Sequence, residues 1–368
     1  MSIPDPLPLA QALIRCQSVT PADGGAQDVL AEALEQKGFT VHRLPFGTTP
    51  NLFARRGTGG THLCFAGHTD VVPPGDAPWT AGPFDATVRD GVLFGRGACD
   101  MKGAIAAFVA ALDGPCPASV SLLITGDEEG PATDGTVRVL DWMEHNGHVP
   151  DLCLVGEPTN PHHLGEVIKI GRRGSLNIHM AVQGTQGHVA YPHQAENPVH
   201  KLVQILADLT AEPLDGGSEW FEPSSLQVTS IDVGNPATNV IPARAEARFN
   251  IRFNDLHTAG RLQDWVAGIG ARHADTVEIT AACSGESFLT QPGPMIERLR
   301  TAIAGACGTE PRFDTGGGTS DARFIARLCP VAEFGLVGAT MHKADESVDV
   351  GELRALAATY RAVLAAFA

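Results

Sequence analysis

The sequence predicts an α/β protein into which a smaller α+β domain is inserted. Near both ends of the chain, short apolar runs alternate with helical stretches, whereas the middle alternates apolar with polar residues at strand spacing. At roughly 150 residues per domain, 368 residues suggest two domains. We place the first domain, with a mainly parallel mixed sheet, at residues 1–173 and 285–368, and the insertion, with an antiparallel sheet, at 174–284.

Apolar runs of strand length, separated by helical stretches, define the first domain. The earliest helical stretch ends at Gly38, and glycine is a common helix stop. Strands that alternate with helices favour a mainly parallel sheet. The expected strands are 39–44, 51–56, 62–67, 119–126 and 151–156, and the expected helices are 23–38, 101–114, 134–147 and 350–367.

Strict alternation defines the inserted domain. In residues 245–253 the apolar side chains of Ala, Phe and Ile occupy every second position, and Glu, Arg and Asn lie between them. Such a strand belongs to a sheet with one face in water and the other covered. Two helical stretches, near 197–210 and 257–273, could cover the apolar face. The other expected strands are 175–183 and 225–233.

The composition argues against several classes of protein. With a net charge of −16, the chain has few basic residues from which to build a nucleic-acid binding surface or a polybasic membrane patch. The longest apolar run, 103–112, is too short to span a membrane, and the first ten residues lack the pattern of a signal peptide. We therefore expect a cytoplasmic protein that binds neither nucleic acid nor membranes, and that needs local arginines for an anionic substrate.

Acidic and histidine side chains follow the predicted strands at the points where the strands end. In open α/β sheets ligands bind outside the carboxyl ends of the strands, so these side chains should converge on one crevice. Any single one could be a cap or a turn residue. The groups are His68 and Asp70, then Asp100, then Glu128 and Glu129, and finally Glu157.

The spacing within these groups suits metal-assisted hydrolysis. His68 and Asp70 are two residues apart, so in a strand they share a face and Asp70 could accept the ring N–H of His68. Glu128 and Glu129 are neighbours and must point differently. One could bind a metal while the other takes a proton from water.

Other chemistries lack their motifs. The chain has no GxSxG, HExxH or GxxxxGK[ST] string, and Asp100 occupies the third glycine position of a dinucleotide-type motif that begins at Gly95. The eight cysteines form no CxxC pair, which argues against a thiolate zinc site and against a disulfide framework. Carboxylate and histidine ligands remain the favoured interpretation.

Five strings resemble the metal motifs of the di-zinc aminoacylase and glutamate carboxypeptidase family. Four further strings are similar to those of the desuccinylases within that family, and the match runs in order over nearly the whole chain. The five are GHTDVVP (67–73), GRGACDMKG (95–103), GDEEG (126–130), GEPT (156–159) and MHKADE (341–346). The four are IGRRGS (170–175), QGHVAYPHQAENPVHK (186–201), TNVIPA (238–243) and TGGGTSDARF (315–324).

The resemblance implies a di-zinc peptidase-like catalytic domain. One zinc ion would be held by His68 and Glu157, the other by Glu129 and His342, with Asp100 bridging the two. Each zinc then keeps an open position, as a catalytic site requires. Cobalt or manganese could substitute, because carboxylate and imidazole ligands accept several divalent metals.

The resemblance also implies roles for the neighbours of these ligands. Glu128 would be the general base, and Asp70 would orient His68. The peptide bond between Asp100 and Met101 would be cis. Cys99 departs from the family, which carries a small residue there, and a thiol at this position could compete for metal.

The inserted domain would be a dimerisation and lid domain. By the resemblance, His188 and Asn239 would come from the partner subunit of a homodimer and hydrogen-bond the developing oxyanion. Arginine's fork matches a carboxylate, which suits a dicarboxylate substrate. The expected substrate-binding residues are Arg172, Arg252, Asn239, Gly318, Thr319 and Ser320.

The function implied is hydrolysis of N-succinyl-LL-2,6-diaminopimelate to succinate and LL-2,6-diaminopimelate. Two alternatives stay open from the sequence. The chain could be a deacylase for another N-acyl amino acid, such as acetylornithine, or a metal-binding protein of the same fold without activity. Glu128 speaks against the latter, since a protein that only binds metal needs no base.

Overall fold

The computed structural model describes residues 3–368 and divides into two compact units. Unit 1 contains the residues up to Ile170 together with Thr290–Asp314 and Ser320–Ala368; unit 2 contains Gly171–Leu289 and Thr315–Thr319. Unit 2 is thus inserted into unit 1, as expected. Its boundaries differ from the expected 174–284 because a two-stranded ribbon, β9 (Gly171–Arg172) with β16 (Phe288–Leu289), clusters with unit 2.

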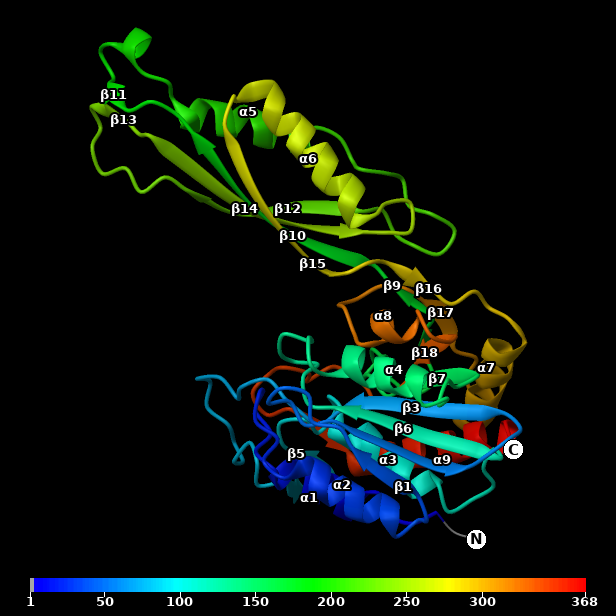
Figure 1. The fold of residues 1–368 in the computed structure, drawn as a ribbon. Helices are drawn as coiled ribbons and strands as arrows, with labels where there is room; N and C mark the ends of the chain where they lie inside the picture. Colours follow the sequence, from blue (N-terminus) through cyan, green and yellow to red (C-terminus); the bar gives the residue numbers. More distant parts are fainter. Residues whose placement is uncertain (1–2) are drawn as a thin grey trace. The chain divides into compact units, whose positions relative to one another are not determined.

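Unit 1 is built on a mixed eight-stranded sheet with parallel pairs at its centre (Figure 1). Strand β3 is buried along its whole length and pairs in parallel with β6 on one side and β7 on the other. The prediction of a mainly parallel mixed sheet is confirmed. In sheet order the strands are β1 (Thr40–Arg43), β2 (Leu52–Gly57), β6 (Ser119–Thr125), β3 (His62–His68), β7 (Leu152–Val155), β18 (Val331–Glu333), β8 (Val167–Lys169) and β17 (Arg312–Asp314).

Helices cover both faces of this sheet (Figure 1). Helix α3 is buried at every residue, because its alanines let the sheet and α9 approach closely. Phe65 of β3 stacks on Phe108 of α3 at 4.2 Å, and Tyr360 of α9 meets both rings edge-on. The helices of unit 1 are α1 (Leu7–Arg15), α2 (Ala26–Glu35), α3 (Lys102–Ala111), α4 (Thr136–His145), α7 (Pro294–Cys307), α8 (Ala322–Ile325) and α9 (Val350–Ala366).

Unit 2 is a four-stranded antiparallel sheet with two helices on one face. Alternate residues of β10 and β14, such as Ile178 and Phe249, pack with Leu206 of α5 and Val266 of α6 in one apolar core. The opposite face carries polar side chains, such as Asn177 and Asn250. The prediction of a sheet with one face in water and the other covered is therefore confirmed. The elements are β12 (Ser225–Asp232), β14 (Arg244–Phe253), β10 (Gly174–Gln183), β15 (Val277–Gly285), α5 (Pro198–Thr210), α6 (Ala259–His273), η1 (Pro192–Gln194), β11 (Gly187–His188) and β13 (Val240–Ile241).

Every strand and helix named from the sequence is present within a few residues of its expected bounds. Helix α1 was not expected: its segment is rich in proline, but one proline lies in the first turn, where a missing N–H costs nothing. All eight cysteines are free. Among the described residues no helix is both long and apolar enough to cross a membrane.

The fold predicts a pH-dependent stability that originates at His62, the first residue of β3. Burial and the charge of Arg55 lower the pKa of His62 from 6.5 to about 4, while its ring contacts Ser121 Oγ and the Val149 carbonyl oxygen. Between these pH values the unfolded chain binds a proton that the folded chain does not. The contribution of His62 to stability should therefore fall by about 2 to 3 kcal/mol on acidification from pH 6.5 to pH 4.

Urea unfolding of the parent and of His62→Gln over this pH range measures the effect. Over this range the stability loss of His62→Gln should be smaller than that of the parent by about 2 to 3 kcal/mol, because the variant has no imidazole to protonate. His145→Gln, at an exposed position of α4, should lose as much stability as the parent. Equal pH slopes for His62→Gln and the parent would contradict the assignment.

Candidate metal centre

Three adjacent parallel strands bring acidic and histidine side chains to one edge of the unit 1 sheet. His68 is the last residue of β3, Glu128 and Glu129 follow β6, and Glu157 follows β7. Strand β3 lies between the other two, and its register aligns His68 with Thr125 of β6. The predicted convergence at the carboxyl ends of the strands is therefore present for these residues.

Asp100 and His342 reach the same place from loops. The expectation that Asp100 follows a strand of the main sheet was wrong: β5 (Val92–Phe94) belongs to a separate three-stranded sheet with β4 (Thr87–Arg89) and β19 (Ser347–Asp349). Asp100 instead lies in the loop between β5 and α3, and His342 lies between β18 and β19. The Asp100–Met101 peptide is cis, as the resemblance implied.

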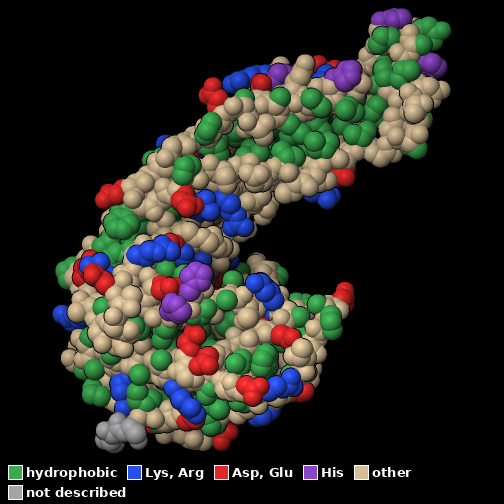
Figure 2. Space-filling view, turned by 180° about the vertical axis from the view of Figure 1, so that it is seen from behind, with side chains coloured by type: hydrophobic (Ala, Val, Ile, Leu, Met, Phe, Trp, Pro, Cys, Tyr) green, Lys and Arg blue, Asp and Glu red, His purple; other side chains and the backbone are tan. Residues whose placement is uncertain are grey.

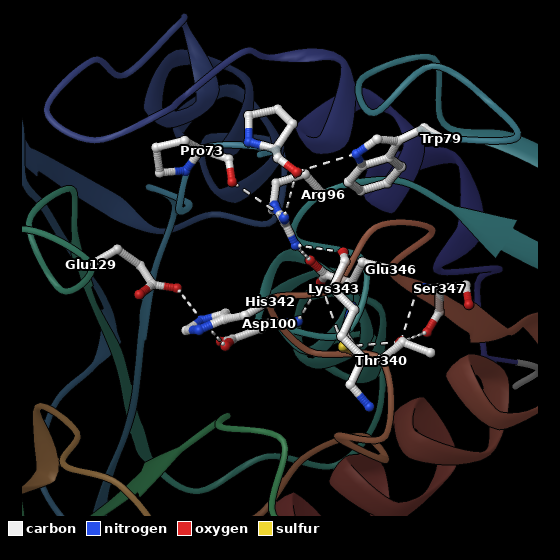
Figure 3. Close-up of polar contacts among 12 residues, drawn as sticks. Pro73, Trp79, Arg96, Asp100, Glu129, Thr340, His342, Lys343, Glu346 and Ser347 are labelled. Atoms are coloured by element: carbon white, nitrogen blue, oxygen red, sulfur yellow. Dashed lines mark hydrogen bonds and ion pairs between the residues drawn. The ribbon is translucent and has the colours of Figure 1, made fainter. Parts of the chain in front are cut away.

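The two carboxylate oxygens of Asp100 face two different histidines. His68 Nε2 lies 3.2 Å from Asp100 Oδ1, and His342 Nε2 lies 3.2 Å from Asp100 Oδ2. On the outer sides, Glu157 Oε1 lies 3.8 Å from His68 Nε2 and Glu129 Oε1 lies 2.9 Å from His342 Nε2. Figure 3 shows Asp100, Glu129 and His342 pointing toward one another. Each side of Asp100 thus offers one histidine and one glutamate.

The orientation of His68 differs in one detail from the expectation. Its Nδ1–H donates to the backbone carbonyl of Asp70 at 2.9 Å, and the Asp70 carboxylate lies 3.7 Å from that nitrogen. The carboxylate is instead turned toward the backbone N–H groups of Glu128 and Glu129, which donate to it at 3.3 and 3.0 Å. Asp70 therefore fixes the His68 tautomer through its backbone and holds the two glutamates through its side chain.

The electrostatics of the cluster fit divalent cations. Burial raises the pKa of Glu157 well above its usual value, and the charges of Asp100 and Glu128 add to the rise. Burial also raises the pKa of Asp70 to about 6. The ligand atoms of His68, Asp100 and Glu129 all lie within 4.8 Å of one another. Buried carboxylates that repel one another, with imidazole nitrogens between them, form a donor set that zinc, cobalt or manganese would satisfy.

Glu128 lies beside His68 and Glu157. Its carboxylate has an oxygen within 4.8 Å of ligand atoms of His68 and Glu157. Burial, together with the charges of Asp321, Glu129 and Asp100, raises the pKa of Glu128 to about 8, although His68 opposes the rise. A carboxylate with a pKa near neutrality is suited to general base catalysis.

The environment of the Cys99 thiol does not favour metal binding. Burial and the charges of Glu346 and Asp100 raise its pKa well above the usual value, and its S–H donates to Glu346 Oε1 at 3.4 Å. A neutral, hydrogen-bonded thiol is a poor competitor for zinc.

His188 and Asn239 lie side by side in unit 2, at the ends of the short strand pair β11 and β13. The N–H of Val189 donates to the Asn239 carbonyl at 3.1 Å. The N–H of Ala190 donates to His188 Nδ1 at 3.1 Å, so in neutral His188 the proton is on Nε2. His188 is exposed and Tyr191 packs against its ring, and Figure 2 shows histidine side chains on the surface at this end of unit 2.

The expected substrate-binding residues divide between the units. In unit 2, buried Arg172 donates from Nη1 to the Gly318 carbonyl at 3.1 Å, and Thr319 is half-buried. Arg252 lies on β14, where burial and the charge of Arg173 lower its pKa. In unit 1, the Ser320 hydroxyl donates to Glu333 at 2.7 Å, so that proton is not free for a substrate.

Reasoning from the residues alone missed His342, which only the resemblance indicated. The residue does not directly follow a strand. The feature that marks it as unusual is seen only in the structure: its φ of 61° lies in the left-handed region that non-glycine residues seldom adopt. Three further residues were also not anticipated: Arg96 and Glu346, which contact the loops of His342 and Asp100, and Asp321, whose charge raises the pKa of Glu128.

Comparisons with known proteins identify relatives of this chain. Residues 64–366 match the model of peptidase family M20/M25/M40. A succinyl-diaminopimelate desuccinylase of Gluconacetobacter diazotrophicus is 65% identical over 97% of this chain and 96% of its own length. The enzyme of the same name from Granulibacter bethesdensis is 62% identical over 98% of this chain and 97% of its own length.

Solved structures share the fold at low sequence identity. An aminopeptidase from Bacillus cereus has a TM-score of 0.81 at 17% identity, covering 100% of this chain and 99% of its own. A dinuclear metal-binding peptidase of family M20 from Bacillus subtilis has a TM-score of 0.73 at 17% identity, covering 98% and 96%. The match over most of the chain and the close relatives show that the chain belongs to peptidase family M20/M25/M40.

Proposed function

We propose that this chain hydrolyses the amide bond of N-succinyl-LL-2,6-diaminopimelate to give succinate and LL-2,6-diaminopimelate, in diaminopimelate and lysine biosynthesis. The observation that carries the chemistry is the Asp100 carboxylate between two histidines, with Glu128 close to His68 and Glu157. The substrate rests on the two desuccinylases that match this chain over nearly its full length.

We propose two zinc ions as the cofactor, one held by His68 and Glu157 and the other by Glu129 and His342, with Asp100 shared. Cobalt and manganese suit the same ligands. When bound, the two ions would lower the pKa of a water molecule and polarise the scissile carbonyl. The remaining work falls to the protein's own side chains.

Glu128 moves the proton. Its carboxylate accepts a proton from the attacking water as the new C–O bond forms, and then delivers that proton to the amine nitrogen as the C–N bond breaks. The N–H groups of Glu128 and Glu129 are tied to Asp70, so the two neighbouring carboxylates keep separate directions. That separation allows one to serve as base while the other serves as ligand.

Unit 2 supplies hydrogen-bond donors and positive charge. We propose that His188 Nε2–H, whose tautomer the Ala190 N–H fixes, donates to the oxyanion, with Asn239 beside it. Arg172, Arg252 and the turn of Gly318, Thr319 and Ser320 would bind the substrate carboxylates, with Ser320 acting through its backbone because its hydroxyl donates to Glu333. Burial and the nearby charge of Arg173 lower the pKa of Arg252, and a bound anion would stabilise two such neighbouring cations.

Glutamine variants separate the roles of the two glutamates. Glu128→Gln should keep two zinc ions per chain but lose roughly 10² to 10⁴ in kcat, because it lacks the base. Glu129→Gln should lose zinc as well, since it removes a ligand. Zinc content by atomic absorption and turnover are measured together, with Glu144→Gln on the surface of α4 as control. Unchanged turnover in Glu128→Gln would remove it from the mechanism.

Substrate choice tests the arginines. N-acetyl-diaminopimelate lacks the distal carboxylate, so its kcat/KM should be at least about 10²-fold below that of the succinyl substrate, because buried donors would be left without a partner. Arg252→Ala should narrow the gap by harming mainly the succinyl substrate. Arg248→Ala, exposed on the same strand, is the matched control. Equal kcat/KM for both substrates in the parent would overturn the substrate assignment and leave the metal chemistry standing.

We further propose a homodimer in which His188 acts on the partner's metal centre. Losing an oxyanion donor typically costs ~2.7 to 4 kcal/mol, so His188→Ala and Glu128→Gln homodimers should both be nearly inactive. In a heterodimer with one of each, both lesions fall on one active site if His188 acts across the dimer. The other site is then intact, and up to half of the parent activity per dimer should return. No recovery in purified heterodimers would refute the shared site.

A further inference from the structure

A buried ion pair lies behind the metal centre and is not used by the mechanism above. Arg96 and Glu346 are 1% and 0% exposed, and Arg96 Nη1 lies 2.7 Å from Glu346 Oε2. A buried ion pair is weak evidence for stability by itself, because desolvation of both charges offsets their attraction. The other contacts of this pair, drawn in Figure 3, suggest a different role.

The second carboxylate oxygen of Glu346, which does not contact Arg96, holds the backbone at Asp100. The N–H groups of Cys99 and Asp100 both donate to Glu346 Oε1 at 3.1 Å, and the Cys99 thiol donates to the same oxygen. The Gly95 N–H donates to the Glu346 carbonyl at 2.9 Å. Glu346 therefore fixes both ends of the loop that presents Asp100.

The guanidinium of Arg96 joins this loop to two others that carry ligands. Nη1 also donates to the Lys343 carbonyl, next to His342, at 3.1 Å. Nη2 donates to the carbonyls of Pro73 and Pro74, in the loop after His68, at 3.3 and 3.4 Å. The Trp79 ring covers the guanidinium at 5.2 Å (Figure 3). One side chain thus contacts the loops of three ligands.

The loop of His342 needs such support. His342 and Asp345 have φ angles of 61° and 57°, in the left-handed region that costs non-glycine residues free energy. Conformations of this kind persist where the surroundings over-determine them. The Lys343 carbonyl and the Glu346 side chain are held by Arg96 at both ends of this strained segment.

We propose that Arg96 and Glu346 are positioning residues that pre-set the metal site between Asp100, Glu129 and His342. The inference rests on the proposed two-metal function. Asp100 is shared by both sites, but His342 belongs to this site alone and its strained loop depends on the pair. His68 and Glu157, the other ligands of the second site, come from the ends of β3 and β7. The pair therefore controls the affinity of one metal site far more than that of the other.

Stepwise zinc titration of metal-free protein by calorimetry tests the proposal. Arg96→Lys keeps the charge but cannot reproduce the fork to Glu346 and the carbonyls, and Glu346→Gln keeps the shape but removes the charge. We expect one of the two binding steps to weaken by about 10- to 100-fold, the usual effect of losing a group that orients a ligand. The other step should weaken by a clearly smaller factor, because it shares only Asp100 with the first. Arg354→Lys is the control, because exposed Arg354 also makes a two-point contact, with Asp5.

Equal weakening of both steps, or no change in either, would overturn the proposal, since a general loss of structure does not select one site.

A second measurement on the unaltered chain covers the case in which the variants do not fold. In metal-free protein the amides of Cys99 and Asp100 should already exchange at least ~100-fold slower than in an unstructured peptide. Exchange at unstructured rates until zinc is added would also overturn it. Absence of desuccinylase activity would contradict the proposed function but leave both readouts unaffected.

Discussion

The geometry of the centre depends on one carboxylate that faces two imidazoles. Asp100 presents Oδ1 to His68 and Oδ2 to His342 at 3.2 Å each, so the positions of both histidines are defined relative to this group. His68 comes from a fully buried strand and Asp100 and His342 come from loops. The sheet therefore fixes one side of the centre, and the loops around Arg96 and Glu346 fix the other.

Charge balance explains why this arrangement suits cations. Burial raises the pKa values of Glu128, Glu157 and Asp70, while hydrogen bonds from His342 and His68 outweigh burial and lower that of Asp100. Hydrogen bonds to Asp100 and Glu129 raise the pKa of His342 to about 10. A divalent cation would offset the cost of burying these carboxylates and would replace the contacts between them and the imidazoles. In a chain of net charge −16, this cluster is a local site for positive charge.

Much of the fold could be predicted from periodicity, because burial repeats along strands and helices. The runs that became β3, β6 and β7 are mostly apolar and are buried throughout, and the residues after them had to meet at one sheet edge. Loop-borne residues carry no such signal. Asp100 follows a strand of a different sheet, and His342 follows none, so periodicity alone could not place them.

Side-chain partners were harder to predict than positions. The sequence correctly placed Asp70 near His68, but which oxygen accepts the ring N–H depends on competing donors, and the N–H groups of Glu128 and Glu129 occupy the carboxylate. The pairing of Arg96 with Glu346 joins residues 250 positions apart, and only the folded chain shows it. Short-range patterns hold no information about such contacts.

The most direct test of the account is a crystal structure of zinc-loaded protein with anomalous scattering measured on both sides of the zinc absorption edge. Two peaks about 3.5 to 4 Å apart are expected, as in other two-metal sites. One peak should contact His68, Glu157 and one oxygen of Asp100, and the other should contact Glu129, His342 and the second oxygen. A single peak, or two peaks of which only one touches Asp100, would contradict the shared carboxylate.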